Sequence, residues 1–111
     1  MGKENKYLNK LILIGINFFD KEENIIEQYQ THGIIKSFTD SNMMKIERSD
    51  LSIFILPFDK KSMKKAKKGT YKEHESGIDI ENPDFLTTWS VNSTSPEHLE
   101  NIKLYGFSEF E

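Results

Sequence analysis

The apolar residues of this chain come in short runs, and a polar turn follows almost every run. The first run, residues 8–19, places Leu, Ile and Phe on both alternating faces, which predicts a central strand covered on both sides for part of its length. Residues 20–24 then have the length of a hairpin loop, and the return strand is expected over residues 25–38. Strands joined by such tight turns favour an antiparallel sheet over a helical fold.

Further strands are expected at short intervals along the rest of the chain. Turn residues separate apolar or β-branched segments at 43–48, 52–56, 70–74, 78–81 and 85–91. Gly15 and Gly33 lie inside predicted strands, where glycine typically marks a bend or a bulge. The pattern predicts a mainly β protein, a small antiparallel barrel or sandwich of about seven strands.

Two short helices complete the predicted fold. Asp59 is a favoured N-cap residue, so we expect a connector helix from there through Ala66. The segment Ser95-Pro96-Glu97 has the N-cap, first-turn proline and early acid of a helix start, which predicts a C-terminal helix over residues 95–105 with Leu99, Ile102 and Leu104 as its apolar stripe. Residues 1–6 are expected to be a flexible tail, and residues 1–111 a single domain without a signal peptide.

Charge is distributed unevenly along the chain. The net charge is -3, and seven of the 15 basic residues lie within residues 60–72, which contain no acid. This lysine strip consists of Lys60, Lys61, Lys64, Lys65, Lys67, Lys68 and Lys72. The rest of the chain has 8 basic against 18 acidic residues, a net charge of -10, which attracts basic partners and repels nucleic acid. The strip has the charge of a nucleic-acid contact, but Arg48 is the only arginine and few aromatic residues are near, so a solvated connector is favoured.

The residues offer little for catalysis. No cysteine is present, the glycines form no phosphate-binding loop, and no serine lies in a nucleophile elbow. His32, His74 and His98 lack the spacing of a zinc motif, so we expect one buried, hydrogen-bonded histidine and two exposed ones. No catalytic residue, metal site or cofactor is predicted, and an enzyme is the least favoured class. No apolar run approaches the roughly 20 residues of a membrane span.

Carboxylates gather around two predicted hairpins. In strand geometry Glu73 and Glu75 share a face, and so do Asp79 and Glu81. The four could form a glycosidase-like site, but a solvated acidic face that docks a cationic partner is favoured. A rival acidic patch lies on the first hairpin and consists of Glu22, Glu23 and Glu27.

Several segments together resemble a family of small bacterial all-β proteins. They are residues 7–15 (YLNKLILIG), 26–28 with His32 and Gly33, 52–57 (SIFILP), and the block from 69–71 (GTY) through 82–89 (NPDFLTTW). The resemblance covers about residues 7–91 and brings no catalytic residues with it. The chain departs from the family at the lysine strip, where Phe58 and Lys68 stand in place of the family's prolines.

Members of this family are similar to immunity proteins encoded beside polymorphic toxins, including those of contact-dependent growth inhibition. The resemblance therefore implies a cytoplasmic immunity protein. Together with the acidic body, it leads us to expect that the chain binds and neutralises a cognate toxin, a basic nuclease, through an acidic surface. The alternative is a small-barrel nucleic-acid-binding module that uses residues 60–72. Membrane and nucleic acid are not the expected partners.

Overall fold

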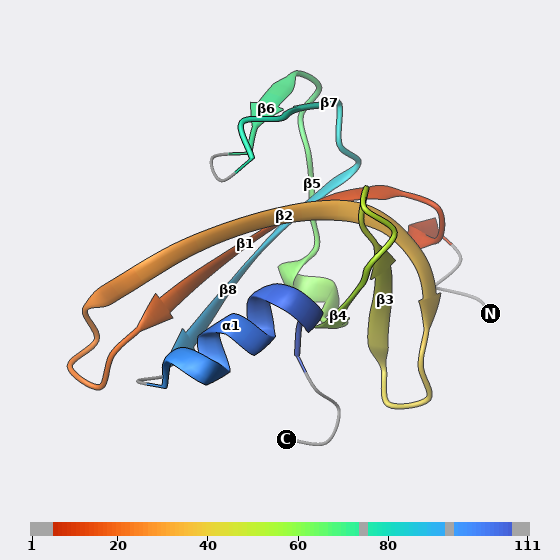
Figure 1. Ribbon diagram of the computed structural model, residues 1–111. Coiled ribbons are helices and arrows are strands. Elements are labelled where there is room, and N and C mark those ends of the chain that lie inside the picture. The colour runs from red at the N-terminus through yellow and green to blue at the C-terminus, as the bar shows by residue number, and fades with distance from the viewer. Residues whose placement is uncertain (1–5, 74–75, 93–94, 108–111) are drawn as a thin grey trace.

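The computed structural model describes residues 6–73, 76–92 and 95–107 (Figure 1). Six strands form one sheet in the order β4-β3-β2-β1-β8-β5, and β6 pairs with β7 in a second sheet. The strands are β1 (Leu11–Phe19), β2 (Ile25–Phe38), β3 (Met43–Glu47), β4 (Ile53–Pro57), β5 (Lys64–Lys65), β6 (Thr70–Lys72), β7 (Asp79–Glu81) and β8 (Phe85–Asn92), and the helix is α1 (Pro96–Tyr105).

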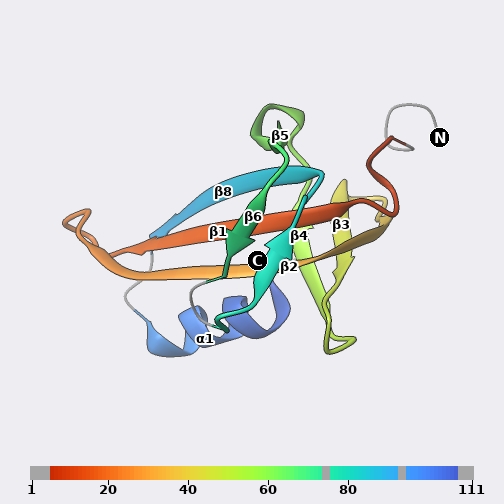
Figure 2. The same ribbon diagram turned by 90° about the horizontal axis from the view of Figure 1, so that it is seen from above.

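The mainly β prediction is confirmed in its sandwich-like form. The large sheet does not close into a barrel, because β4 and β5 form its two edges in the described part of the chain. Helix α1 lies against one face of the sheet and the hairpin of β6 and β7 lies over the other (Figures 1 and 2). The predicted C-terminal helix is therefore present and docked.

One pairing departs from the expected antiparallel meander. β1 pairs with β2 antiparallel on one side, but with β8 parallel on the other, from Ile12 opposite Phe85 to Phe19 opposite Asn92. A parallel pair needs a long crossover connection. Here the connection contains β2 to β7, which returns the chain to the end of the sheet where β1 begins.

The core lies between the sheet and α1. Alternate β1 residues Ile12, Ile14, Ile16 and Phe18 are at most 1% exposed, and they pack with buried residues of the other strands and of α1. Leu13 is buried on the opposite face, so β1 is covered on both sides for part of its length, as predicted.

The helix buries a narrower stripe than its sequence suggested. Leu99 and Ile102 are buried in the core, whereas Leu104 is 52% exposed, so its place in the predicted apolar stripe was wrong. The side chain of Ser95 accepts a hydrogen bond from the amide of His98, and Gly106 ends the helix with φ of 83°. These are the start and end that the sequence indicated.

The connector helix is much shorter than predicted. Asp59 does cap a turn, since its carboxylate accepts from the amide of Lys61, but the turn is a single 3-10 turn, Lys60–Ser62. Lys64 and Lys65 then form β5 and pair with Leu86 and Phe85 of β8. The edge of β8 offers backbone partners to this segment, and an extended chain sends successive lysines to opposite faces.

The two strand glycines differ in their roles. β1 pairs continuously past Gly15 with both neighbours, so the bend predicted there is not present as a bulge, and the irregularity lies at Phe18 and Phe19. At Gly33 a Cβ atom would lie 2.5 Å from the carbonyl oxygen of Glu47 and 2.6 Å from a methyl carbon of Ile46. Gly33 therefore permits the close approach of β3 to β2.

Candidate functional site

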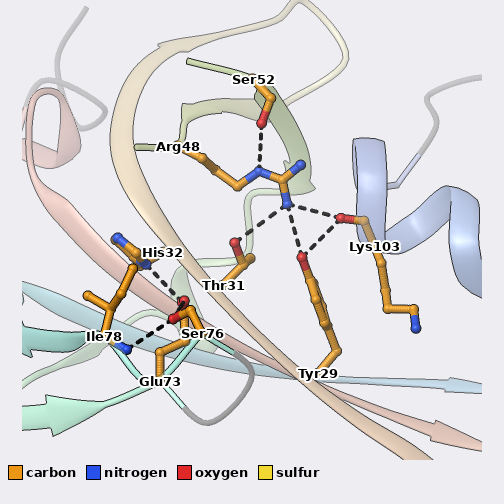
Figure 3. Close-up of polar contacts among 9 residues, drawn as sticks. All are labelled: Tyr29, Thr31, His32, Arg48, Ser52, Glu73, Ser76, Ile78 and Lys103. Atoms are coloured by element: carbon orange, nitrogen blue, oxygen red, sulfur yellow. Dashed lines mark hydrogen bonds and ion pairs between the residues drawn. The ribbon is translucent and has the colours of Figure 1, made fainter. Parts of the chain in front are cut away.

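A polar cluster centred on Arg48 lies where β3 ends beside β2 (Figure 3). Nη1 of Arg48 donates to the carbonyl oxygen of Lys103 at 3.0 Å and to the hydroxyl of Tyr29 at 3.2 Å, with Thr31 Oγ1 3.5 Å away. Nη2 donates to the carbonyl oxygen of Leu104 and Nε donates to Ser52 Oγ at 3.0 Å. One side chain thus joins β2, the β3–β4 turn and the end of α1.

This arrangement gives Arg48 a structural task. The last carbonyls of a helix lack partners within the helix, and a cation at that end is favourable. The guanidinium also lies 4.8 Å from the ring centre of Phe54, which adds a cation–π contact. Tyr29 supports the same helix end, because its hydroxyl donates to the carbonyl of Lys103 at 3.1 Å. The cluster therefore fixes α1 on the sheet.

A second polar cluster joins β2 to the hairpin of β6 and β7. Nδ1 of His32 lies 2.8 Å from Oε2 of Glu73, and the hydroxyl of Ser76 donates to Oε1 of Glu73 at 2.7 Å (Figure 3). Glu73 is only 6% exposed, so its carboxylate is held inside the protein by these two partners. Ser76 donates to Glu73 and not to His32, so the order of these contacts differs from that of a Ser–His–carboxylate triad, in which the serine donates to the histidine.

A shallow hollow of about 280 Å³ borders both clusters and is lined by Thr31, His32, Arg48 and Glu73, among others. The polar groups on its wall bond to one another and so hold the hairpin and the helix in place. Within residues 6–73, 76–92 and 95–107, no group of three or more His, Asp or Glu side chains could hold a metal ion. His98 is exposed on α1, and His74 lies outside the described residues.

The first predicted acidic face is divided in the structure. Glu73 points inward to His32, and Glu75 lies outside the described residues. Asp79 and Glu81 are exposed on β7, but Nζ of Lys72 lies 3.5 Å from the carboxylate of Asp79 and partly neutralises it. Glu73 and Asp79 therefore do not contribute to one open acidic surface as expected.

The rival acidic patch has two members, Glu22 and Glu23, that are exposed at the surface. Glu22 and Glu23 are exposed in the turn between β1 and β2, at the far end of the long hairpin (Figure 1). The carboxylate of Asp20 accepts hydrogen bonds from the amides of Glu22 and Asn24, both at 2.9 Å, so the turn has a defined shape. Ile25 and Ile26 follow directly and are 55% and 47% exposed. We call Glu22, Glu23, Ile25 and Ile26 the acidic tip.

Glu27, the third member of that patch, has a different environment. Its carboxylate is 2.6 Å from Nζ of Lys103, and Glu100 is 3.0 Å from the same nitrogen. The hydrogen bond that Lys103 donates to Glu27 raises the pKa of Lys103 above its ordinary value, and Glu100 adds to the effect. Glu27 thus ties β2 to α1 beside the acidic tip.

No strand of the described residues pairs with one edge of the first half of β2, next to the acidic tip. β2 pairs with β1 from Ile25 onward, but β3 pairs only with its second half, from Ile34. In the described part of the chain no strand covers the outer edge of the first half of β2. A strand edge without a strand partner is a place where another chain can add backbone hydrogen bonds.

All seven lysines of the lysine strip are exposed. The structure brings Lys6 and Lys10 from the start of the chain to the same region, beside Lys60 and Lys65. Sequence reasoning did not connect these two lysines to the strip, because they lie about 50 residues earlier in the chain. Sequence reasoning also missed the hydrogen-bond partners of Arg48. That Arg48 is the only arginine in the sequence was a signal that could have drawn attention to it.

Comparison of the chain with protein-family models, with curated proteins and with solved structures found no match. No helix in the described part of the chain is long and apolar enough to cross a membrane.

Proposed function

We propose that this protein is an immunity protein that binds a cognate toxin through the acidic tip and blocks its activity. The observation that carries the proposal is the combination found there. Exposed Glu22 and Glu23 stand beside exposed Ile25 and Ile26, on a hairpin whose outer edge has no strand partner among the described residues.

Each feature supplies a different part of tight binding. Negative charge accelerates association with a basic partner. Apolar side chains at the centre of an interface contribute most of the affinity once water is excluded. The hydrogen bonds of Asp20 hold the turn in one shape, which lowers the entropy that binding costs.

A nuclease domain is the toxin that this chemistry favours. Enzymes that cleave nucleic acid carry cationic clefts for phosphate, and the acidic body of this chain complements such a cleft. The proposed setting is the bacterial cytoplasm, in a system of the contact-dependent growth inhibition type, as the family resemblance implies. The chain acts by covering the cleft, and the proposal needs no catalysis by its own residues.

The partner would first be isolated with the tagged protein at low salt and with added nuclease, which removes nucleic-acid bridges. The recovered protein is then purified and assayed for nuclease activity. The proposal expects a basic protein bound one to one, with its activity abolished at equal concentration. Recovery of a partner whose activity is unaffected by saturating amounts of this chain would contradict the proposal.

Charge reversal then locates the interface. Glu22→Lys with Glu23→Lys is expected to slow association at least tenfold at low salt and to reduce its salt dependence. Asp79→Lys with Glu81→Lys is the matched control, because it makes the same change in net charge on the hairpin of β6 and β7. Equal slowing by both pairs would show that net charge alone acts, and would remove the acidic tip as the docking surface.

A further inference from the structure

A second surface of this molecule has the opposite charge from the acidic tip. Among the described residues, a groove of about 610 Å³ is lined by Lys6, Lys10, Lys60 and Lys65, by one acid, Asp84, and by Tyr7, Met63 and Phe85. The lysines come from two segments that lie about 50 residues apart in the sequence, residues 6–10 and residues 60–65. The fold therefore gathers positive charge beyond what the lysine strip shows by itself.

The sheet explains how these lysines meet. Lys65 of β5 pairs directly with Phe85 of β8, and Phe85 in turn pairs with Ile12 of β1. Lys10 stands just before β1, so lysines flank the start of β8 on both sides. Asp84 holds neighbouring segments together. Its carboxylate accepts a hydrogen bond from the amide of Leu11 at 2.9 Å, and its carbonyl oxygen accepts one from the amide of Ala66 at 3.1 Å.

The floor of the groove is apolar. The ring of Tyr7 is buried and packs against Phe85, with ring centres 5.1 Å apart, while Phe85 and Met63 remain partly exposed. A cationic rim over an aromatic and apolar floor is the combination that proteins use for single-stranded nucleic acid, where lysines contact phosphates and bases lie on the floor. Lysine contacts phosphate as a point charge, without the paired geometry that reads a base.

We propose that this groove binds the backbone of single-stranded nucleic acid without sequence preference. Three further exposed lysines of the lysine strip, Lys61, Lys67 and Lys68, lie within three positions of Lys60 or Lys65 in the sequence and add positive charge there, which suits a chain-like polyanion better than a single phosphate group. The site lies at the start of β1, and the acidic tip lies at its end, about 30 Å away for a nine-residue strand. The two surfaces can therefore be occupied independently.

The test uses the full chain and a fluorescent oligo(dT) of about 12 nucleotides, followed by anisotropy over a range of salt concentrations. Four lysine–phosphate contacts predict that log K falls against log salt with a slope of roughly -3. Lys10→Gln with Lys65→Gln should halve that slope and weaken binding about 10- to 100-fold near 50 mM salt. Thermal unfolding confirms that the variant is folded.

The matched control is Lys21→Gln with Lys45→Gln, which removes two exposed lysines outside the groove and makes the same change in net charge. It is expected to change the affinity less than threefold. Absence of binding at low salt, or an equal loss in the control, would overturn the site. A duplex of the same length that bound as tightly as the single strand would overturn the assignment to single strands. No toxin is needed, so failure here leaves the proposed immunity function untouched.

Discussion

Nδ1 of His32 lies 2.8 Å from Oε2 of Glu73, and this contact joins β2 to the hairpin of β6 and β7. With the carboxylate ionised, Nδ1 is the donor. Glu73 is buried, and Ser76 donates to its other oxygen. The hairpin that covers the outer face of the sheet is thus fastened by a carboxylate that the sequence placed on an exposed acidic face.

Removal of that carboxylate should loosen the hairpin. Glu73→Ala leaves His32 and Ser76 without their partner, so we expect a loss of about 2 kcal/mol in the free energy of unfolding. Amide exchange in β6 and β7 should accelerate more than exchange in β1. Asp79→Ala is the control, because its ion pair with Lys72 is exposed and contributes at most a few tenths of a kcal/mol. Equal effects of the two substitutions would show that Glu73 does not fasten the hairpin.

The ammonium group of a lysine should not be able to replace the guanidinium of Arg48. Arg48→Lys keeps the charge but cannot reach the carbonyls of Lys103 and Leu104 together with the hydroxyl of Ser52. We expect a loss of about 2 kcal/mol in stability, with faster amide exchange in the last turn of α1. Lys36→Met, which breaks the exposed pair with Glu47, serves for comparison and should have little effect. Unchanged protection of α1 in Arg48→Lys would disprove this role.

The contribution of Lys103 to stability should disappear only at high pH. Its pKa is raised above 10.5 by the hydrogen bond that it donates to Glu27, so folding favours the charged form. A raised pKa gives a contribution that is complete below 10.5 and is lost as pH rises through the folded-state value. Wild type should therefore exceed Lys103→Met by about 1 kcal/mol at neutral pH, and the difference should shrink above pH 10.5.

Urea unfolding at several pH values measures this difference. Lys45→Met is a suitable reference, because Lys45 is exposed on β3. If the difference in the free energy of unfolding between wild type and Lys103→Met increased at alkaline pH, its sign would contradict the predicted role of this ion pair.

Two glycine substitutions on neighbouring strands should differ sharply. Gly33→Ala places a methyl group against the carbonyl of Glu47 and the side chain of Ile46, so we expect a loss of about 2 kcal/mol and a midpoint lower by several degrees. The nearest atoms to a Cβ at Gly15 are 4.0 Å away, which is ordinary contact. Gly15→Ala should therefore melt close to wild type. If the two variants melted together, the close approach of β3 at Gly33 would not be a constraint.

Local signals in the sequence predicted the elements that depend on local chemistry. The turn after β1 follows from its polar residues, and the start of α1 follows from Ser95 and Pro96, because caps and tight turns are set by nearby side chains. The connector helix was predicted wrongly because the conformation of this segment depends on a strand that is distant in the sequence. Asp59 caps its turn as predicted. Lys64 and Lys65 form a strand because they pair with the edge of β8, and no local sequence pattern indicates that this edge is nearby.

The candidate sites depend on contacts between distant residues, and those were not predictable from one sequence. His32 and Glu73 are 41 positions apart, and Arg48 is 55 positions from Lys103. Alternation along a strand gives the face of a side chain only once the strand is placed, so Glu73 was assigned to the surface. Glu22 and Glu23 were identified as a candidate patch because a hairpin turn is exposed wherever the hairpin is placed.

The parallel pairing of β1 with β8 sets the order in which the molecule can be completed during synthesis. A chain emerging from the ribosome can form the hairpin of β1 and β2 and can add β3 and β4, because these strands are consecutive. The other side of β1 waits for residues 85–92, and α1 follows later still. The nascent four-strand sheet therefore leaves the apolar face of β1 uncovered until residues 85–105 have been synthesised, when β8 and α1 arrive almost together and close the core.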